Sequence, residues 1–206
     1  MAKINFKPGN MLYPLPAVLV SCCDTGTSPN LLTVAWTGTV CTNPPMVSIS
    51  VRPERYSYSL IKNSGEFVVN LTTKDLAFAV DYCGVRSGRD VNKWEKCHLT
   101  MVPADTVSCP MVAESPVNIE CHVTEIKELG SHHMFLAEVT AVHVDDTYLD
   151  EKNSFHLNDS GLLAYSHGTY FTLGDALGTF GYSVQKEKKR KKANGDKNYH
   201  KNPRHN

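Results

Sequence analysis

The chain has 206 residues with 21 Lys and Arg against 21 Asp and Glu, so it lacks the basic surplus of a typical nucleic-acid binder. The zero net charge hides an asymmetry, because residues 186–206 hold nine Lys or Arg and two acids, a net +7, and the preceding residues carry −7. No apolar run approaches the ~20 residues that span a bilayer, and the composition is that of a globular domain. We therefore expect a cytoplasmic protein with a domain over residues 1–185, no membrane association, and a disordered basic tail over residues 186–206.

The first predicted elements are strands. Residues 15–21 form an apolar run, and residues 31–40 are rich in β-branched and aromatic side chains. In residues 46–51, apolar side chains alternate with serines. This period of two predicts a strand with one buried and one polar face.

Two helices are predicted next. Residues 55–63 break the alternation and end before Gly65, a residue that favours helix termination. After a strand over residues 66–71, Thr72 or Thr73 can cap a helix through residues 74–81 that stops at Gly84.

Strands return over residues 117–127 and 134–144, separated by the turn-forming residues 128–131. Several strands with two or three short helices, and no repeating βαβ rhythm, predict a mainly β fold. We expect an antiparallel barrel with helical insertions.

Several common chemistries have no motif in this sequence. GxGxxG, GxxxxGK[ST] and GxSxG are all absent, which removes the simplest dinucleotide-binding, P-loop and serine-hydrolase interpretations. A metal site is conceivable from the pairs Cys97–His98, Cys121–His122 and His132–His133. Neighbours on a strand point to opposite faces, so each pair would donate at most one ligand, and we expect no metal. The seven cysteines show no CxxC spacing and are expected to be reduced thiols.

One loop is open to two interpretations. Residues 86–90 (RSGRD) combine two guanidinium groups with a glycine, and Lys93 follows, so the loop could cradle a phosphate. Arg–Asp pairing in a solvated loop is the alternative.

The position of Trp36 within a predicted strand indicates by default a core or barrel-end residue, whose indole N–H needs an acceptor.

An ordered series of motifs, covering roughly residues 8–182, resembles the flavin reductase-like, FMN-binding split-barrel family, and within it the flavoredoxins. The series consists of PAVLV (16–20), PN (29–30), TVAW (33–36), NPPM (43–46), SISVRP (48–53), RY (55–56), SGEFVVNL (64–71), DYCG (81–84), SGRDVNK (87–93), Glu120, LG (129–130) with His132, and Tyr165 ahead of Tyr170. The resemblance implies a six-stranded antiparallel Greek-key split barrel that forms a homodimer, with FMN at the subunit interface.

The resemblance also implies a set of cofactor-binding residues. Ser57 would open a short helix whose N-terminus suits the FMN phosphate, and Lys93 would add positive charge near the phosphate or the flavin ring. His132 and Tyr165 would approach from the partner subunit, with Tyr170 or Phe171 as alternatives to Tyr165 and a surface turn as the alternative for His132. The full set is Asn30, Trp36, Thr37, Ser50, Arg52, Ser57, Lys93, His132 and Tyr165.

Two functions follow from the resemblance. The first is an oxidoreductase that passes electrons from NAD(P)H or a donor protein through FMN to free flavin, an iron–sulfur protein or a small acceptor. The second is a flavoredoxin-type electron carrier without nicotinamide turnover of its own. For the basic tail, solvation is the simpler expectation, and a contact with nucleic acid, anionic lipid or an acidic partner is the alternative.

Overall fold

The computed structural model describes residues 1–184, so the predicted basic tail lies outside the described residues. The chain divides into two compact units, Met1–Leu173 and Gly174–Asn206. All the strands belong to the first unit, and in the second the described part contains the short 3-10 helix η4 (Tyr182–Val184). Within residues 1–184, no helix combines the length and the apolar character needed to cross a membrane.

A seven-stranded sheet forms the body of the first unit, and every strand pair in it is antiparallel. The expectation of a mainly β, antiparallel fold is confirmed. The strands follow in the spatial order β3 (Asn30–Val34), β2 (Val18–Cys22), β6 (Glu66–Asn70), β9 (Val117–Leu129), β10 (His132–Val144), β5 (Pro45–Val51) and β4 (Thr37–Thr42).

Strand β2 is buried on both faces, which explains its uninterrupted apolar sequence. Val18 and Val20 face one hydrophobic cluster, which also contains Phe67 and Phe135. Leu19, pointing the other way, belongs to a second cluster under the helices. The barrel interior and the helix-covered layer therefore share this strand.

The strand predicted over residues 31–40 is broken in the structure. Its first part, β3, pairs with β2, whereas its second part, β4, pairs with β5. Between them the carbonyl of Trp36 accepts a hydrogen bond from the backbone N–H of Ser50 at 2.8 Å. The chain thus leaves one edge of the sheet and joins the other, and local β propensity carries no information about that exchange of partners.

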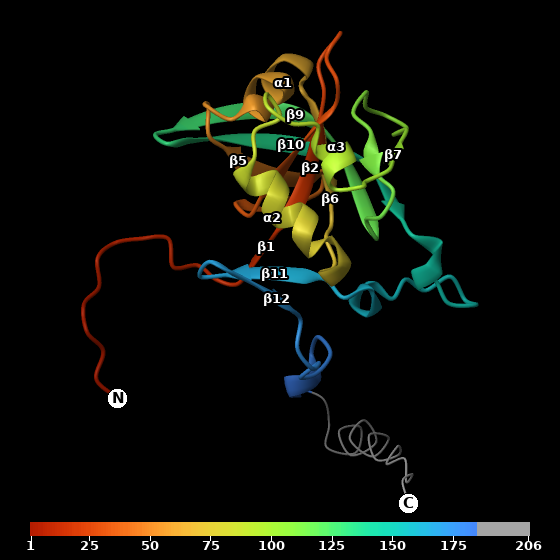
Figure 1. The fold of residues 1–206 in the computed structure, drawn as a ribbon. Helices are drawn as coiled ribbons and strands as arrows, with labels where there is room; N and C mark the ends of the chain where they lie inside the picture. The colour runs from red at the N-terminus through yellow and green to blue at the C-terminus, as the bar shows by residue number, and fades with distance from the viewer. Residues whose placement is uncertain (185–206) are drawn as a thin grey trace, which may run out of the picture. The chain divides into compact units, whose positions relative to one another are not determined.

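Helix α1 (Tyr56–Ser64) ends as predicted. Gly65 follows it with φ 70°, in the left-handed region, and its N–H donates to the carbonyl of Ile61 at 2.9 Å. Figure 1 shows α1 at one end of the sheet, where it contacts β2, β3 and β6.

The second predicted helix differs at both ends. It begins as the 3-10 helix η1 (Lys74–Leu76), continues as α2 (Ala77–Val85), and neither Thr72 nor Thr73 caps it through a side chain. Gly84 lies inside α2 instead of ending it. A β-carbon there would lie 3.4 Å from Thr33 Cβ on β3, so this glycine serves close helix–sheet packing.

Several short elements were not predicted. Strands of two to four residues, and a single-turn helix, lack the length for a recognisable sequence period and depend on partners distant in the chain. They are α3 (Lys93–Lys96), β7 (Met101–Val102), β8 (Met111–Val112), η2 (Asp146–Tyr148), η3 (Leu157–Ser160), β11 (Leu163–Ser166) and β12 (Thr169–Thr172). The strand β1 (Leu15–Pro16) lies within the strand predicted over residues 15–21, which the structure divides into β1 and β2.

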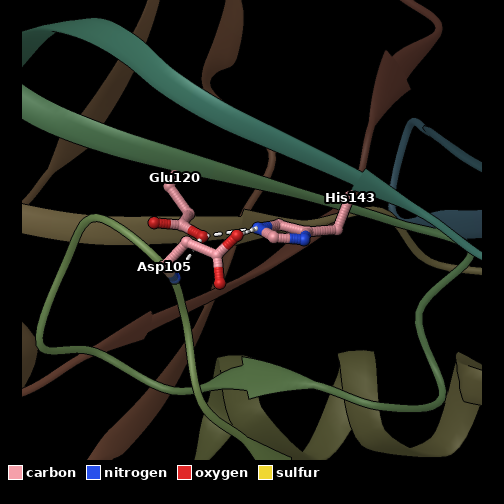
Figure 2. Close-up of side chains that lie close together, drawn as sticks. All are labelled: Asp105, Glu120 and His143. Atoms are coloured by element: carbon pink, nitrogen blue, oxygen red, sulfur yellow. Dashed lines mark hydrogen bonds and ion pairs between the residues drawn. The ribbon is translucent and has the colours of Figure 1, made fainter.

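A fully buried carboxylate, Glu120 on β9, fixes the loop that precedes β8 (Figure 2). Its oxygens accept hydrogen bonds from the backbone N–H of Asp105 at 2.8 Å, from the N–H and hydroxyl of Thr106, each at 2.6 Å, and from Nε2 of His143 at 2.5 Å. Burial alone raises the pKa of Glu120, but these donors outweigh it and bring the pKa down to about 2.

The same three side chains, Asp105, Glu120 and His143, are the one set of potential metal ligands close together among the described residues. Glu120 already accepts four hydrogen bonds, which fill the lone pairs of both oxygens. A metal ion would have to displace one of these donors. These contacts therefore identify Glu120 as the residue that anchors the loop before β8, and we do not assign a metal site to this group.

Glu120→Ala should lower the free energy of unfolding by about 3 kcal/mol, because it leaves several buried donors without an acceptor. Glu125→Ala, on the exposed part of the same strand, is the matched control and should change it by less than about 0.5 kcal/mol. Chemical denaturation at pH 7 measures both. Because the folded pKa is depressed, the contribution of Glu120 is complete above pH ~4.5 and is lost as the pH falls through about 2. Equal losses in the two variants at pH 7 would contradict the anchoring role.

Candidate functional site

A cavity of about 550 Å³ opens in the first unit and is lined by β3, β5, the start of α1, the end of α2, the loop over residues 86–89, and single residues of β10, β11 and β12. This volume lies within the range of small-molecule sites, about 300–1,000 Å³. Eight of the nine residues proposed from the sequence line it: Asn30, Trp36, Ser50, Arg52, Ser57, Lys93, His132 and Tyr165.

Three arginines, Arg55, Arg86 and Arg89, line one part of the cavity. Within residues 1–184 none of them forms an ion pair with a carboxylate. Arg55 donates to the carbonyl of Gly84 at 3.2 Å, and the Arg89 guanidinium lies 5.6 Å from the ring centre of Tyr56. The loop over residues 86–90 therefore shows no internal Arg–Asp pairing, which leaves its guanidinium groups available to an anionic ligand.

Gly88 lets this loop approach β3 closely. A β-carbon at position 88 would lie 2.1 Å from Oδ1 of Asn30, which is too close for any side chain. The buried Asn30 amide in turn donates to the Ser57 hydroxyl at 2.7 Å. One side chain therefore connects β3, the first turn of α1 and the arginine loop.

The first turn of α1 adds positive character of its own. Arg55, Tyr56 and Ser57 all line the cavity, and no side chain caps this helix. The first N–H groups of a helix have no intrahelical acceptor, and the helix dipole places partial positive charge there. An anion in the cavity can accept hydrogen bonds from this turn as well as from the arginines.

Lys93 lines the cavity but is almost completely buried. Its ammonium group donates to the carbonyls of Leu31 at 2.7 Å and Cys83 at 2.9 Å. Burial lowers the pKa of Lys93 below its ordinary value. Two of its three protons are thus bound by protein, so Lys93 ties α2 and α3 to β3 and supplies charge from beneath the cavity instead of reaching freely into it.

Aromatic groups line another part of the cavity. The Trp36 indole is 45% exposed, and its ring centre lies 5.5 Å from that of His132 with a 36° angle between the planes. Burial, followed by the nearby Arg52 charge, lowers the pKa of His132, so the ring is neutral at pH 7. In a separate three-stranded sheet of order β1-β11-β12, the rings of Tyr165 and Tyr170 lie 5.6 Å apart. These surfaces suit a planar conjugated ligand.

Thr37 is the predicted site residue that does not line the cavity. Its hydroxyl donates to the carbonyl of Ser48 at 2.8 Å. Successive side chains of an extended segment point to opposite faces, so a chain that presents Trp36 to the cavity turns Thr37 away.

His132 and Tyr165 were expected to approach from a partner subunit. In the structure both line the cavity of their own chain. The β9–β10 hairpin returns beside β5 and brings His132 to Trp36, while pairing with β1 positions Tyr165.

Sequence reasoning left out several lining residues. Arg55 and Tyr56 belonged to the motif series without an assigned role, and Tyr170 was only an alternative to Tyr165. The Tyr170 hydroxyl donates to Asp81 at 3.4 Å, and burial, together with the Asp81 carboxylate, raises the pKa of Tyr170. Arg86 and Arg89 belonged to the loop that the sequence offered as a possible phosphate cradle, but they had no place in the assigned set of site residues.

Comparison with known proteins supports this description. The family model described as a flavin reductase like domain matches residues 11–174, nearly the whole first unit. The chain belongs to the flavin reductase-like family. An uncharacterized protein of Archaeoglobus fulgidus is 34% identical over 161 residues, which cover 78% of this chain and 89% of that protein.

Two solved structures of flavoredoxins are similar to this chain over nearly its whole length. Flavoredoxin of Desulfovibrio vulgaris (Miyazaki F) has a TM-score of 0.82 and 27% identity, covering 89% of this chain and all of that one. Flavoredoxin from Methanosarcina acetivorans has a TM-score of 0.81 and 27% identity, covering 90% and 100%. The split-barrel fold implied by the sequence motifs is confirmed.

Gly88→Ala should destabilise the first unit by about 1–3 kcal/mol, because the new methyl group overlaps Asn30 and must displace it or the loop. Gly38→Ala is the control, since a β-carbon at Gly38 would meet nothing within 4 Å. Thermal unfolding measures both variants. A Gly88→Ala protein as stable as the Gly38→Ala protein would show that the loop does not rest on Asn30.

Proposed function

We propose that this protein is an FMN-binding oxidoreductase that passes electrons from NAD(P)H, or from a donor protein, through bound FMN to an acceptor. The observation that carries the proposal is one cavity lined both by three arginines that form no ion pair within residues 1–184 and by the Trp36–His132 pair. FMN combines a phosphate with a planar conjugated ring, and family membership points to a flavin.

The residues present fit the phosphate of FMN. Arg55, Arg86 and Arg89 can neutralise a dianion, and the first turn of α1 offers backbone N–H groups. Gly88 keeps the loop close to Asn30, which leaves the space above it to the ligand.

The flavin ring would lie against Trp36 and His132, with Ser50 and Arg52 along its polar edge. Lys93 would stabilise negative charge on the ring through its field, because two of its protons are already bound. Tyr165 and Tyr170 would exclude water from the other side.

When bound, FMN supplies the capacity to accept a hydride or single electrons and to release them to an acceptor. The chain's residues bind and orient the ring, hold charge near it and keep water away. Hydride transfer needs no general acid or base from the protein, so positioning provides most of the rate.

The second candidate is a flavoredoxin-type electron carrier that exchanges electrons between protein partners. It is favoured by the similarity to two flavoredoxins over their whole length. Free flavin, an iron–sulfur protein or a small molecule would serve as acceptor in either case. We further propose that the protein is a cytoplasmic homodimer, which light scattering would test.

Purified protein should be yellow and bind FMN more tightly than riboflavin. Arg86→Ala should weaken FMN binding about tenfold, roughly 1.4 kcal/mol, and leave riboflavin binding unchanged, because only FMN carries the phosphate. Lys127→Ala, an exposed β9 cation paired with Glu125, is the control. Fluorescence titration measures the affinities of the wild type and of both variants for each of the two ligands. Equal weakening for both ligands would place Arg86 away from the phosphate.

Stopped-flow mixing of the FMN-loaded protein with NADH and with NADPH separates the two candidates. Bleaching of flavin absorbance at 1 s⁻¹ or faster, the order of typical enzyme turnover, is the result expected for the oxidoreductase. Slow or absent bleaching, with rapid reduction by an electron-donor protein, would reject it in favour of the electron carrier.

A further inference from the structure

A pair of thiols lies beside the proposed flavin cavity and has no part in the function proposed above. Sγ of Cys83, in α2, is 3.9 Å from Sγ of Cys97, which directly follows α3. Cys83 is completely buried, whereas Cys97 is partly exposed. Such a pair has one sulfur that a reagent can reach and a second behind it.

A second cavity, of about 380 Å³, gives access to Cys97. Three carboxylates, those of Asp75, Glu114 and Asp145, line it, and none of its lining residues is a lysine or arginine. Tyr148 adds an aromatic face. This lining favours a cationic molecule over an anionic one.

On the side away from the second cavity, Lys93 links Cys83 and Cys97 to the proposed flavin cavity. The Lys93 ammonium donates to the carbonyl of Cys83, and the N–H of Cys97 donates to the carbonyl of Lys93 at 3.0 Å. Gly84, next to Cys83, is packed against Thr33 and lines the flavin cavity.

We propose that Cys83 and Cys97 form a redox-active dithiol that is oxidised by a cationic low-molecular-weight disulfide entering the second cavity, and that oxidation weakens flavin binding. A disulfide bond is about 2.05 Å long, so the sulfurs must approach by nearly ~2 Å. Both helices are held at β3, α2 at Gly84 and α3 through Lys93 and Trp94, so the approach of the two sulfurs must disturb these contacts. Of these groups, the Lys93 ammonium lies beneath the flavin cavity.

The low-molecular-weight disulfide is the oxidant that forms the Cys83–Cys97 bond. The Cys97 thiolate attacks one sulfur of the reagent, the reagent's S–S bond breaks, and one thiol leaves. The Cys83 thiolate then attacks Sγ of Cys97, and the second thiol leaves. Two electrons pass to the reagent, and the two protons lost by the protein thiols end on the two released thiols.

Burial of the two thiols lowers the rate of this reaction. It raises the pKa of Cys83 to about 12 and also raises the pKa of Cys97, while the Lys93 charge lowers both in part. The thiolate population is small at neutral pH, so exchange is slow and selective for a reagent that the cavity concentrates. Cys97, the less buried of the two, attacks first.

The test uses the full reduced chain at pH 8, incubated with cystamine or with oxidised glutathione at equal concentration. Cystamine carries positive charge and oxidised glutathione negative charge, so cystamine should react faster at low salt, and added salt should reduce the difference. Peptide mapping should find Cys83 linked to Cys97, with two thiols released per chain. FMN affinity should fall about tenfold on oxidation and return with dithiothreitol.

Two variants sharpen the result. Cys97→Ser should abolish both the cross-link and the change in FMN affinity, whereas Cys41→Ser, at a partly exposed cysteine outside both cavities, should preserve them. The Sγ atoms of Cys23 and Cys109 also lie 3.5 Å apart and could form a disulfide. Peptide mapping must therefore identify which cysteines are linked. Oxidation confined to that pair, a persistent mixed disulfide at Cys97, or no faster reaction with cystamine would overturn the proposal.

The effect on FMN affinity rests on the proposed function, but the cross-link does not. Titration of the reduced protein tests flavin binding by itself. A cross-link that forms while the FMN affinity of the reduced and oxidised proteins is the same would reject the coupling, and absence of FMN binding in the reduced protein would reject the cofactor.

Discussion

The contact between Asn30, Gly88 and Ser57 is the constraint on which the larger cavity depends. Asn30 begins β3 and is buried, its amide is bonded to the first turn of α1, and the arginine loop lies directly on it. A glycine is required at this approach because any β-carbon would overlap the amide oxygen. Helix start, loop and strand are thereby held in one arrangement, which is the preorganisation that tight ligand binding needs.

This arrangement collects positive charge that the protein leaves largely unneutralised. Arg55, Arg86 and Arg89 lie at one cavity without carboxylate partners among the described residues, although the body of the chain as a whole is acidic. Like charges gathered in this way oppose folding, so stability must come from elsewhere. The doubly buried β2, the two hydrophobic clusters and the Glu120 anchor supply it. Members of both clusters, such as Val34 and Ala17, also line the cavity, so the same packing that stabilises the unit supports the walls on which the arginines lie.

Patterns local in sequence were predictable. The serine alternation around Ile49 identified β5, and Gly65 marked the end of α1 because a left-handed residue there requires no long-range information. Short strands such as β11 and the single-turn α3 were missed, since their few residues hold no period and their stability comes from distant partners. Gly84 was misread as a helix terminator because the sequence does not reveal that Thr33 lies against it.

The residues of the site also divide into those that the sequence predicted and those whose placement depends on distant parts of the chain. The motif series determined the family, the mainly antiparallel fold and most of the residues that line the cavity, because these motifs fall where strands and helices begin and end. Tertiary structure alone decided that it is Trp36 and not Thr37 that faces the cavity, that two protons of Lys93 are bound by carbonyls, and that His132 reaches Trp36 within one chain. It also decided that Cys83 and Cys97 adjoin. Residue types and spacing specify what a segment can do, but the direction of a side chain and the identity of its neighbours are fixed by packing between segments far apart in sequence.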